Sequence, residues 1–404
     1  MPQSAIDAGQ ITDHVHRGHA PAPWPAALDP ILSPADLAAA AAEIAHWPGY
    51  APTPLHPLDG LASALDLGAV LYKDEGPRFG LDSFKALGGA YAVLCSVRDA
   101  LAAEGSETIA LADLREGRQA ERAAGLTIVT ATDGNHGRAV AWGCRLAGCA
   151  CRIYVHAEVS EGRCAAMAAL GATVVRVDGD YDESLKRCVE EAEENGWLLV
   201  SDTSFEGYLD VPRRVMAGYG LIVREALEQA AGEPFSHVFV QAGVGGLAGA
   251  VCAGLWQALG EDLPRIVVVE PARAACIVES FRQDRPSAVA IEDETIMAGL
   301  SCGEISLLAW EILSRGGSDA IAIDEDGIVP AMRLLASGDA GDGPVVAGET
   351  AVSGLVGLNA AARDESWRTR LGLTANSRVL LIGTEGASDP AIYRALVPDG
   401  PLSG

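Results

Sequence analysis

The chain has 404 residues, with 29 lysines and arginines against 55 aspartates and glutamates, so its net charge is −26 at neutral pH. This acidic balance argues against a nucleic-acid partner and against binding to an anionic membrane surface. Because 49% of the residues are hydrophobic and 21% are charged, we expect a globular protein with two ordinary domains, or one large core with a subdomain.

The first 30 residues show little periodicity and predict an N-terminal arm on the surface. They lack the apolar stretch of a signal peptide, and no apolar run of membrane-spanning length stands out. His14, His16 and His19 form no recognisable ligand pattern, so no metal site is predicted. The nine cysteines are scattered without metal-ligand spacing, which favours a reduced, cytoplasmic protein.

The segment 71–93, LYKDEGPRFGLDSFKALGGAYAV, is the first with chemical interest. A strand-like run at 69–72 leads through a loop broken by glycine and proline into a predicted helix, with Ser83 as its N-cap and Lys85 in its first turn. The unpaired N–H groups and positive dipole end there favour a neutral amine, the form that attacks a carbonyl. A lysine in this position is more often a solvated surface residue, so the segment alone is a weak signal.

From residue 126 onward, short apolar runs alternate with amphipathic segments, which is typical of parallel sheets covered by helices. Strands are expected at 126–132, 151–156, 172–177, 197–202, 237–241, 265–270, 320–323 and 379–382. Helices are expected to begin near residues 34, 136, 161, 182, 213, 247, 326 and 350. The mixed-charge stretch 105–125 has no clear core face and is interpreted as an excursion.

The pattern therefore predicts an α/β fold with two open, twisted, mainly parallel sheets and flanking helices. We expect an N-terminal arm at 1–30, a large cofactor-binding domain from 31–100 and 206–404, and a small α/β domain at 101–205.

Three loops follow predicted strands. In the first, TATDGNHG at 130–137, the N–H groups at the start of a helix could hold an anion such as a substrate carboxylate. Asn135 adds an amide and Asp133 a carboxylate. An ordinary strand–turn–helix connection with an aspartate cap explains this loop equally well.

The second loop, QAGVGGL at 241–247, has three glycines in four residues, which lets backbone N–H groups approach an anionic ligand closely. Neither the P-loop lysine nor the dinucleotide glycine spacing is present, so a phosphate monoester fits better than a pyrophosphate. A tight turn for close helix–strand packing is the alternative. In the third loop, at 383–386, the Thr384 hydroxyl could hydrogen-bond a ring nitrogen.

The chain contains, in this order, a lysine at a helix start, an asparagine loop, a glycine turn and a threonine hydroxyl near the C-terminus. With this order it resembles the fold-type II pyridoxal-phosphate enzymes, the family of threonine dehydratase and the tryptophan synthase β subunit. Within that family the chain is most similar to the diaminopropionate ammonia-lyases. The resemblance covers more than four fifths of the chain and rests on RFGLDSFKALGGAYA (78–92), TATDGNHGRAVAW (130–142), SDTSFEGY (201–208), EPARAAC (270–276), IMAGLSCGE (296–304) and TEGASD (384–389). The sequence of segment 348–358 departs from the pattern expected in the family.

The resemblance implies that Lys85 carries pyridoxal 5′-phosphate covalently and that Thr384 meets the ring nitrogen. Asn135 would approach the ring's 3′ oxygen, while Phe84 would pack on the ring or belong to the core. The phosphate would be held by Gly243, Val244, Gly245, Gly246 and Leu247. The substrate would be bound by Thr132, Asp133, Gly134, His136 and Asp202.

The resemblance also implies α,β-elimination of ammonia from 2,3-diaminopropionate, giving pyruvate and two ammonia. Asp133 stands where the usual dehydratase has serine. With Lys85 as the nucleophile, Asp133 and Asp202 would hold the distal ammonium or move protons. An aspartate in Ser-Asp-Thr-Ser is also a common turn former, which leaves a structural role open for Asp202.

Two other functions are compatible with the same residues. One is a dehydratase of serine, threonine or 3-hydroxyaspartate, and the other is a non-catalytic pyridoxal-phosphate binder. For the leading function we expect a small amino-acid substrate, a cytoplasmic homodimer, and neither a nucleic-acid nor a membrane partner. Cys276 and Cys302 fall in family-like segments, and whether they form a disulfide is open.

Overall fold

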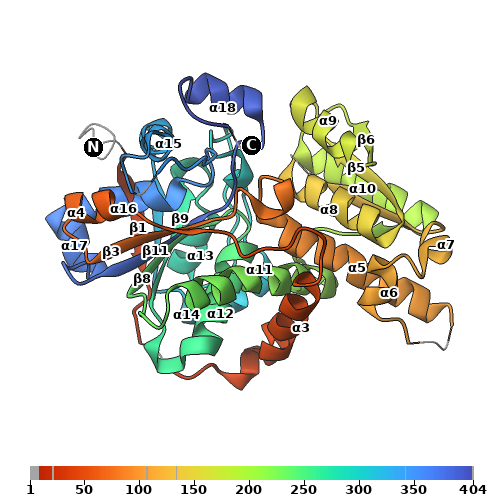
Figure 1. Cartoon of the computed structure of the whole chain (residues 1–404), viewed down its shortest axis with the longest axis horizontal. Coiled ribbons are helices and arrows are strands. Elements are labelled where there is room, and N and C mark those ends of the chain that lie inside the picture. The colour runs from red at the N-terminus through yellow and green to blue at the C-terminus, as the bar shows by residue number, and fades with distance from the viewer. Residues whose placement is uncertain (1–8, 21, 106–107, 133, 342, 403–404) are drawn as a thin grey trace. The chain divides into compact units, whose positions relative to one another are not determined.

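A computed structural model describes residues 9–20, 22–105, 108–132, 134–341 and 343–402. Its contacts divide the chain into two compact units, which are described separately (Figure 1). The first unit comprises Met1–Pro34, Pro52–Ser83 and Ile222–Gly404, and the second comprises Ala35–Ala51 and Phe84–Leu221. The domain boundaries expected near residues 100 and 205 stay a prediction.

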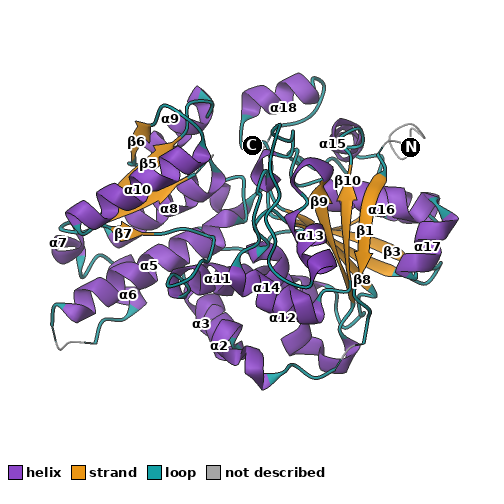
Figure 2. Cartoon of the chain, turned by 180° about the vertical axis from the view of Figure 1, so that it is seen from behind, coloured by secondary structure: helices purple, strands orange, loops and turns teal. Residues whose placement is uncertain are grey.

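A seven-stranded sheet forms the first unit, in the order β1-β10-β9-β8-β11-β3-β2. Its strands are among those drawn in orange in Figure 2. The five inner strands run parallel, and β1 and β2 are antiparallel edges. The strands are β1 (Ile11–His16), β2 (Leu55–Pro57), β3 (Ala69–Asp74), β8 (His237–Gln241), β9 (Arg265–Pro271), β10 (Asp319–Ile323) and β11 (Arg378–Gly383).

The inner strands are apolar on both faces because helices cover both. Phe239 and Val269 belong to one buried cluster with Leu355 of α16, while the alternating residues Val240 and Val268 are fully buried on the opposite face. The helices of this unit are α2 (Asp29–Leu32), α4 (Asp59–Ala64), α12 (Gly246–Leu259), α13 (Cys276–Gln283), α14 (Leu307–Gly316), α15 (Ile328–Ser337), α16 (Ser353–Arg363), α17 (Glu365–Leu371) and α18 (Pro390–Leu396).

The second unit contains an all-parallel sheet of four strands in the order β6-β5-β4-β7, which are β4 (Thr127–Ala131), β5 (Ala150–Val155), β6 (Thr173–Arg176) and β7 (Leu198–Leu199). Helix α10 covers one face, where Val129 and Tyr154 pack against Cys188. The helices are α3 (Pro34–Ile44), α5 (Lys85–Ala103), α6 (Leu111–Arg115), α7 (Ala120–Ala123), α8 (Asn135–Ala147), α9 (Glu161–Ala169), α10 (Tyr181–Asn195) and α11 (Asp210–Gln229), the last continuing into the first unit.

Helices α5 and α8 pack closely because small residues line their contact. A Cβ added at Gly143 would lie 2.7 Å from the Cα of Ala90, which is too close for any side chain. Helix α5 is also long and apolar enough to cross a membrane by length and composition, which the sequence analysis overlooked. It is largely buried inside the protein, and a core helix of alanine and glycine passes the same test.

The predicted α/β class is confirmed, and the apolar runs locate most strands closely. Strand β8 has the predicted ends, whereas the run at 197–202 pairs only over Leu198–Leu199. Strand β1 was not predicted, since the sequence ITDHVH is mostly polar. Nε2 of His14 and Nδ1 of His16 lie 2.8 and 2.9 Å from a carboxylate oxygen of the buried Asp319 of β10, which explains polar residues in that strand.

A buried ion cluster in the first unit anchors the loop that precedes Lys85. The amine of Lys73 lies 2.7 Å from a carboxylate oxygen of Glu225, and the guanidinium of Arg78 lies 2.8 Å from both Glu75 and Glu225. Thr53 donates its hydroxyl to Glu75 at 2.5 Å. Two cations and two anions therefore balance with almost no solvent exposure.

Candidate active site

Lys85 is the first residue of α5, as predicted, but Ser83 does not cap that helix. Phe84 occupies the N-cap position and makes no side-chain cap, while Ser83 lies one residue earlier and forms an isolated bridge with Glu385. The prediction of an N-cap was therefore wrong, because Ser83 pairs with the main chain instead.

The carboxylate of Asp202 receives a hydrogen bond from the amine of Lys85. Asp202 follows β7 in the segment Ser201–Tyr208, and 117 residues separate it from Lys85. Both side chains are partly buried. The helix dipole alone predicted a neutral amine at Lys85, but this carboxylate stabilises the ammonium form and opposes the dipole.

His136 of α8 approaches the same carboxylate from the other side. Its Nδ1 lies 3.8 Å from Oδ2 of Asp202, an ion-pair distance rather than a hydrogen bond. Its Nε2 lies 3.0 Å from the carbonyl oxygen of Val200. Because a carbonyl only accepts, Nε2 carries the hydrogen, and Nδ1 is the unprotonated nitrogen of a neutral ring.

Lys85, Asp202 and His136 influence one another electrostatically. Loss of solvation alone would raise the pKa of Asp202, but the ammonium of Lys85 and the ring of His136 hold that pKa below its usual range. Burial lowers the pKa of His136, and the charge of Lys85 lowers it further, while Asp202 acts in the opposite direction.

Phe84 and Tyr219 complete this group of residues. Their ring centroids are 4.7 Å apart, and the amine of Lys85 lies 5.4 Å from the centroid of Phe84. Burial raises the pKa of Tyr219, and the nearby amine of Lys85 acts in the opposite direction. Sequence reasoning missed Tyr219, because a tyrosine in the amphipathic segment 210–229 gives no signal of its own.

The asparagine loop lies at the start of α8. Thr132 is buried and accepts a hydrogen bond from the N–H of Gly134 at 3.2 Å, and Asn135 is the first helical residue. Asp133 lies outside the described residues, so its predicted role stays a prediction.

In the first unit, the glycine turn joins β8 to α12. Gly245 has a φ of 90° and is the N-cap of α12, a conformation that glycine adopts without strain. A Cβ on Gly243 would lie 2.9 Å from the sulfur of Cys302. The first N–H groups of this 14-residue helix have no partner within the helix and can bind an anion.

Gln241 links the glycine turn to Thr384. Its Nε2 lies 2.8 Å from the carbonyl oxygen of Ile382 and 3.0 Å from Oγ1 of Thr384. The carbonyl identifies Nε2 as the donor, so the Thr384 hydroxyl accepts here and keeps its own hydrogen for another acceptor. Both side chains are buried. Gln241 was not predicted as a site residue, although a polar residue at the end of an apolar strand was the available signal.

Two thiols flank Gly243. The sulfur of Cys276 lies 3.7 Å from the carbonyl oxygen of Gly243 and 3.6 Å from a carboxyl oxygen of Glu270. Cys276 and Cys302 are both free thiols in this structure. Burial raises the pKa of Glu270 to about 8, against the effect of two backbone N–H groups at the start of α13.

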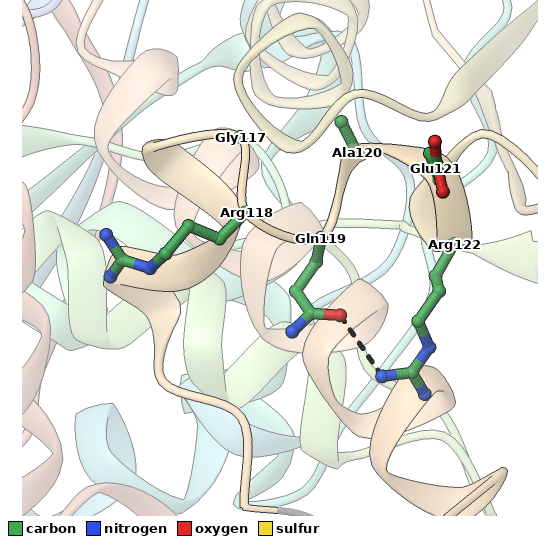
Figure 3. Close-up of a pocket in the computed structure, with 6 residues that line it drawn as sticks. All are labelled: Gly117, Arg118, Gln119, Ala120, Glu121 and Arg122. Atoms are coloured by element: carbon green, nitrogen blue, oxygen red, sulfur yellow. Dashed lines mark hydrogen bonds between the residues drawn. The ribbon is translucent and has the colours of Figure 1, made fainter.

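A cavity of about 360 Å³ in the second unit lies elsewhere, on the excursion (Figure 3). It is lined by Gly117, Arg118, Gln119, Ala120, Glu121 and Arg122. None of the predicted site residues lines it. The guanidinium of Arg122 bonds instead to Gln119 and to the main chain of Leu101, so this hollow shows no arrangement for chemistry.

The residues of each unit fit pyridoxal phosphate. The second unit offers the amine of Lys85 with a carboxylate beside it, and the first offers a helix start with close-approach glycines and a buried hydroxyl at Thr384. Among the described residues, no group of three or more metal-ligating side chains could hold an ion.

Comparison with known proteins places these features in a family. The family model described as "Pyridoxal-phosphate dependent enzyme" matches residues 46–383. A diaminopropionate ammonia-lyase from Salmonella typhimurium is 37% identical over 362 residues, which cover 87% of this chain and 89% of that protein.

Solved structures agree. Diaminopropionate ammonia-lyase from Escherichia coli, in complex with an aminoacrylate–PLP azomethine reaction intermediate, superposes with a TM-score of 0.84 at 33% identity and covers 97% of this chain and 98% of its own. A threonine deaminase from Solanum lycopersicum shares the fold, with a TM-score of 0.73 at 19% identity, covering 96% of this chain and 97% of its own. The chain therefore belongs to the diaminopropionate ammonia-lyase family of fold-type II pyridoxal-phosphate-dependent enzymes.

Proposed function

We propose that the chain is a carbon–nitrogen lyase that eliminates ammonia from 2,3-diaminopropionate with the help of pyridoxal 5′-phosphate. The products are pyruvate and two ammonia. The observation that carries this proposal is the carboxylate of Asp202 at the amine of Lys85. A substrate with a second ammonium needs a carboxylate partner in a partly buried site, whereas a hydroxyl leaving group does not.

When bound, the cofactor supplies an electron sink for the charge that develops at the substrate's Cα. Lys85 would hold it covalently, and Asn135 would supply an amide for the 3′ oxygen. The Thr384 hydroxyl would serve the ring nitrogen, and Phe84 would pack on the ring. Backbone N–H groups at Gly243, Val244, Gly245, Gly246 and Leu247 would hold the phosphate.

The substrate is bound by the asparagine loop and the segment after β7. Thr132, Gly134 and His136 orient its carboxylate, with the N–H groups at the start of α8 favouring a negative charge. Asp202 and Asp133 hold the distal ammonium and accept or return protons at Cα and at the leaving nitrogen. The direct hydrogen bond between Lys85 and Asp202 supports a role of Asp202 in moving protons rather than in forming a turn.

A dehydratase of serine, threonine or 3-hydroxyaspartate is the second candidate, since the same lysine and loops serve that elimination. Pyruvate release should be measured with D- and L-diaminopropionate and with serine, 2-oxobutanoate release with threonine, and oxaloacetate release with 3-hydroxyaspartate. We expect the highest kcat/KM for diaminopropionate. A hydroxy amino acid that surpasses both diaminopropionate isomers would overturn the assignment.

We further propose a cytoplasmic homodimer. Nine scattered cysteines, all described as free thiols, support a reducing compartment. The dimer rests on the family resemblance. Light scattering should give twice the 41.7 kDa mass of the chain, and a mass of one chain would exclude the dimer.

A further inference from the structure

Gln241 is the buried last residue of β8, and Thr384 directly follows the neighbouring strand β11. Because β8 and β11 run parallel, both residues lie at the carboxyl ends of their strands, where open α/β sheets bind ligands. The Gln241 side chain therefore reaches the hydroxyl that is proposed to serve the cofactor's ring nitrogen. The proposed function itself leaves Gln241 without a role.

The amide of Gln241 meets three acceptors through its nitrogen. Nε2 lies 2.8 Å from the carbonyl oxygen of Ile382, 3.0 Å from Oγ1 of Thr384 and 3.2 Å from the carbonyl oxygen of Thr350. The opposite orientation of the amide would bring Oε1 against two carbonyl oxygens, which only accept. As oriented, Oε1 receives no hydrogen bond from the described residues, so the hydrogen bonds of Nε2 hold the amide in place.

An amide nitrogen has two hydrogens for these three neighbours. One goes to Ile382, which is nearest. The carbonyl oxygen of Thr350 already accepts the hydroxyl of Ser353 at 2.9 Å and is farther from Nε2 than Oγ1 of Thr384 is, so the second goes to Thr384. However the two hydrogens are shared, Nε2 cannot accept one. The hydroxyl of Thr384 therefore cannot donate to Gln241.

The hydrogen of the Thr384 hydroxyl is thus left for a ligand. Thr384 is buried, and among the described residues Gln241 is the only hydrogen-bond partner of its hydroxyl. A buried hydrogen without an acceptor costs free energy, which an unprotonated ring nitrogen relieves by accepting it. A protonated ring nitrogen would instead donate to the hydroxyl oxygen and leave that hydrogen without a partner.

We propose that Gln241 is a positioning residue: by donating to Thr384 it makes this hydroxyl a donor to the cofactor's ring nitrogen, and so keeps that nitrogen unprotonated. The inference rests on the proposed place of Thr384 at the ring nitrogen. An unprotonated ring withdraws less charge from the substrate's Cα than a pyridinium does, so Gln241 tunes the electron sink through Thr384.

The test reads the protonation of the cofactor directly, without measuring turnover. Wild type and variants are loaded with pyridoxal phosphate labelled with ¹⁵N in the ring, whose chemical shift separates a protonated from an unprotonated nitrogen. In wild type we expect an unprotonated nitrogen that accepts a hydrogen bond. Gln241→Glu replaces Nε2 by an oxygen, which can accept the Thr384 hydroxyl in either protonation state of the carboxyl. The ring nitrogen then faces a lone pair, so the ratio of its protonated to its unprotonated form should rise at least about tenfold.

Gln257→Glu is the matched control. Gln257 also donates its side-chain amide to a carbonyl oxygen in the first unit, that of Leu32 at 2.7 Å. The same substitution there should leave the ring nitrogen as it is in wild type. A ring ¹⁵N shift that is the same in wild type and Gln241→Glu would overturn the proposal, as would a protonated ring nitrogen in wild type.

Gln241→Met gives a second comparison if the glutamate variant does not fold. Methionine keeps the length of the side chain but offers no hydrogen, so the Thr384 hydroxyl can turn to the carbonyl oxygens that have lost their donor. The ring nitrogen then loses its own donor, and its shift should match that in Thr384→Val. A wild-type shift in Gln241→Met would also contradict the proposal.

Thr384→Val separates this inference from the proposed function. If the ring shift changes in Thr384→Val but not in the Gln241 variants, Thr384 meets the ring nitrogen and Gln241 does not orient it. If the shift of the bound cofactor is unchanged in Thr384→Val, Thr384 does not meet the ring nitrogen, and both its proposed role and the role of Gln241 fail.

Discussion

Lys85 carries the most direct chemical expectation at the scale of single residues. The purified protein should be yellow, and borohydride should fix a pyridoxyl group on the peptide that contains Lys85. Lys73 is the internal control, since its amine is buried in an ion pair with Glu225 and cannot reach a ligand. Lys85→Ala should still retain the cofactor through the glycine turn but lose turnover by several orders of magnitude. A label on Lys73 or Lys186 would contradict the assignment.

Asp133 tests whether the site selects its substrate by charge. An anion facing the second ammonium of diaminopropionate is worth roughly 2–4 kcal/mol, about 30- to 1,000-fold in rate ratio, by analogy with truncating one partner of a buried pair. Asp133→Ser should therefore lose most activity on diaminopropionate and keep dehydration of serine. Asp133→Asn removes the charge of the side chain but keeps its size. If Asp133 acts as a base, this substitution should reduce the rate with one enantiomer of diaminopropionate more than with the other.

Asp180 provides the matched control for this prediction. It caps α10 in the same unit by accepting the N–H of Glu183, so Asp180→Asn changes a helix cap without touching the candidate site. Equal, small losses on every substrate in Asp133 and Asp180 variants would mean that Asp133 is only a cap. The dehydratase function would then be favoured.

At the scale of elements, the turn between β8 and α12 should control cofactor affinity. Gly245→Asp places a carboxylate where the N–H groups at the start of α12 favour a phosphate, and it strains the backbone, which has a positive φ there. We therefore expect the variant to retain less pyridoxal phosphate, measured by the absorbance of the cofactor after dialysis. Gly232→Asp is the control, because Gly232 has a similar φ of 87° and open space around it. If both variants keep the cofactor equally well, the phosphate binds elsewhere.

The strands of this chain differ in how well the sequence predicts them. Strand β8 was predicted to the residue because the apolar run Val238–Val240 lies between the polar residues His237 and Gln241, and a glycine turn follows. Strands β1 and β2 were missed because edge strands need no apolar pattern, and β2 has only three residues, including Pro57.

The candidate site was predicted residue by residue but not as a geometry. Motifs identified Lys85, His136 and Asp202, yet their convergence on one oxygen depends on tertiary packing across 117 residues. Tyr219 and Gln241 were missed for the same reason, since only the fold gives them functional neighbours.

At the scale of the whole molecule, acid should destabilise the protein through its paired carboxylates. Burial alone would raise the pKa of Glu225, but Arg78 and Lys73 lower it. A carboxyl whose pKa is lower in the folded than in the unfolded state stabilises the fold at pH values above its unfolded pKa, and this stabilisation is lost as the pH falls through the folded pKa.

Glu225→Gln should therefore cost about 3–5 kcal/mol near neutral pH, since it leaves buried cations without their partner, and the difference from wild type should shrink in acid. Melting temperatures across the pH range measure both effects. Glu228→Gln is the matched control, because Glu228 pairs with Arg224 on the exposed side of the same helix. A loss of stability in Glu225→Gln that does not depend on pH would mean that packing, and not charge, causes the effect.

The position of β11 in the seven-stranded sheet also sets an order of events during synthesis on the ribosome. Strands β4 to β7 are contiguous in the chain, so their sheet can form early. Strand β3, in contrast, pairs with β11, which is made of residues Arg378–Gly383 and lies between β3 and β8. Nearly the whole chain must be translated before β3, and the loop that leads from it to Lys85, gains its central neighbour. A nascent chain that stops before Arg378 therefore contains Lys85 but not the completed sheet that carries the turn between β8 and α12.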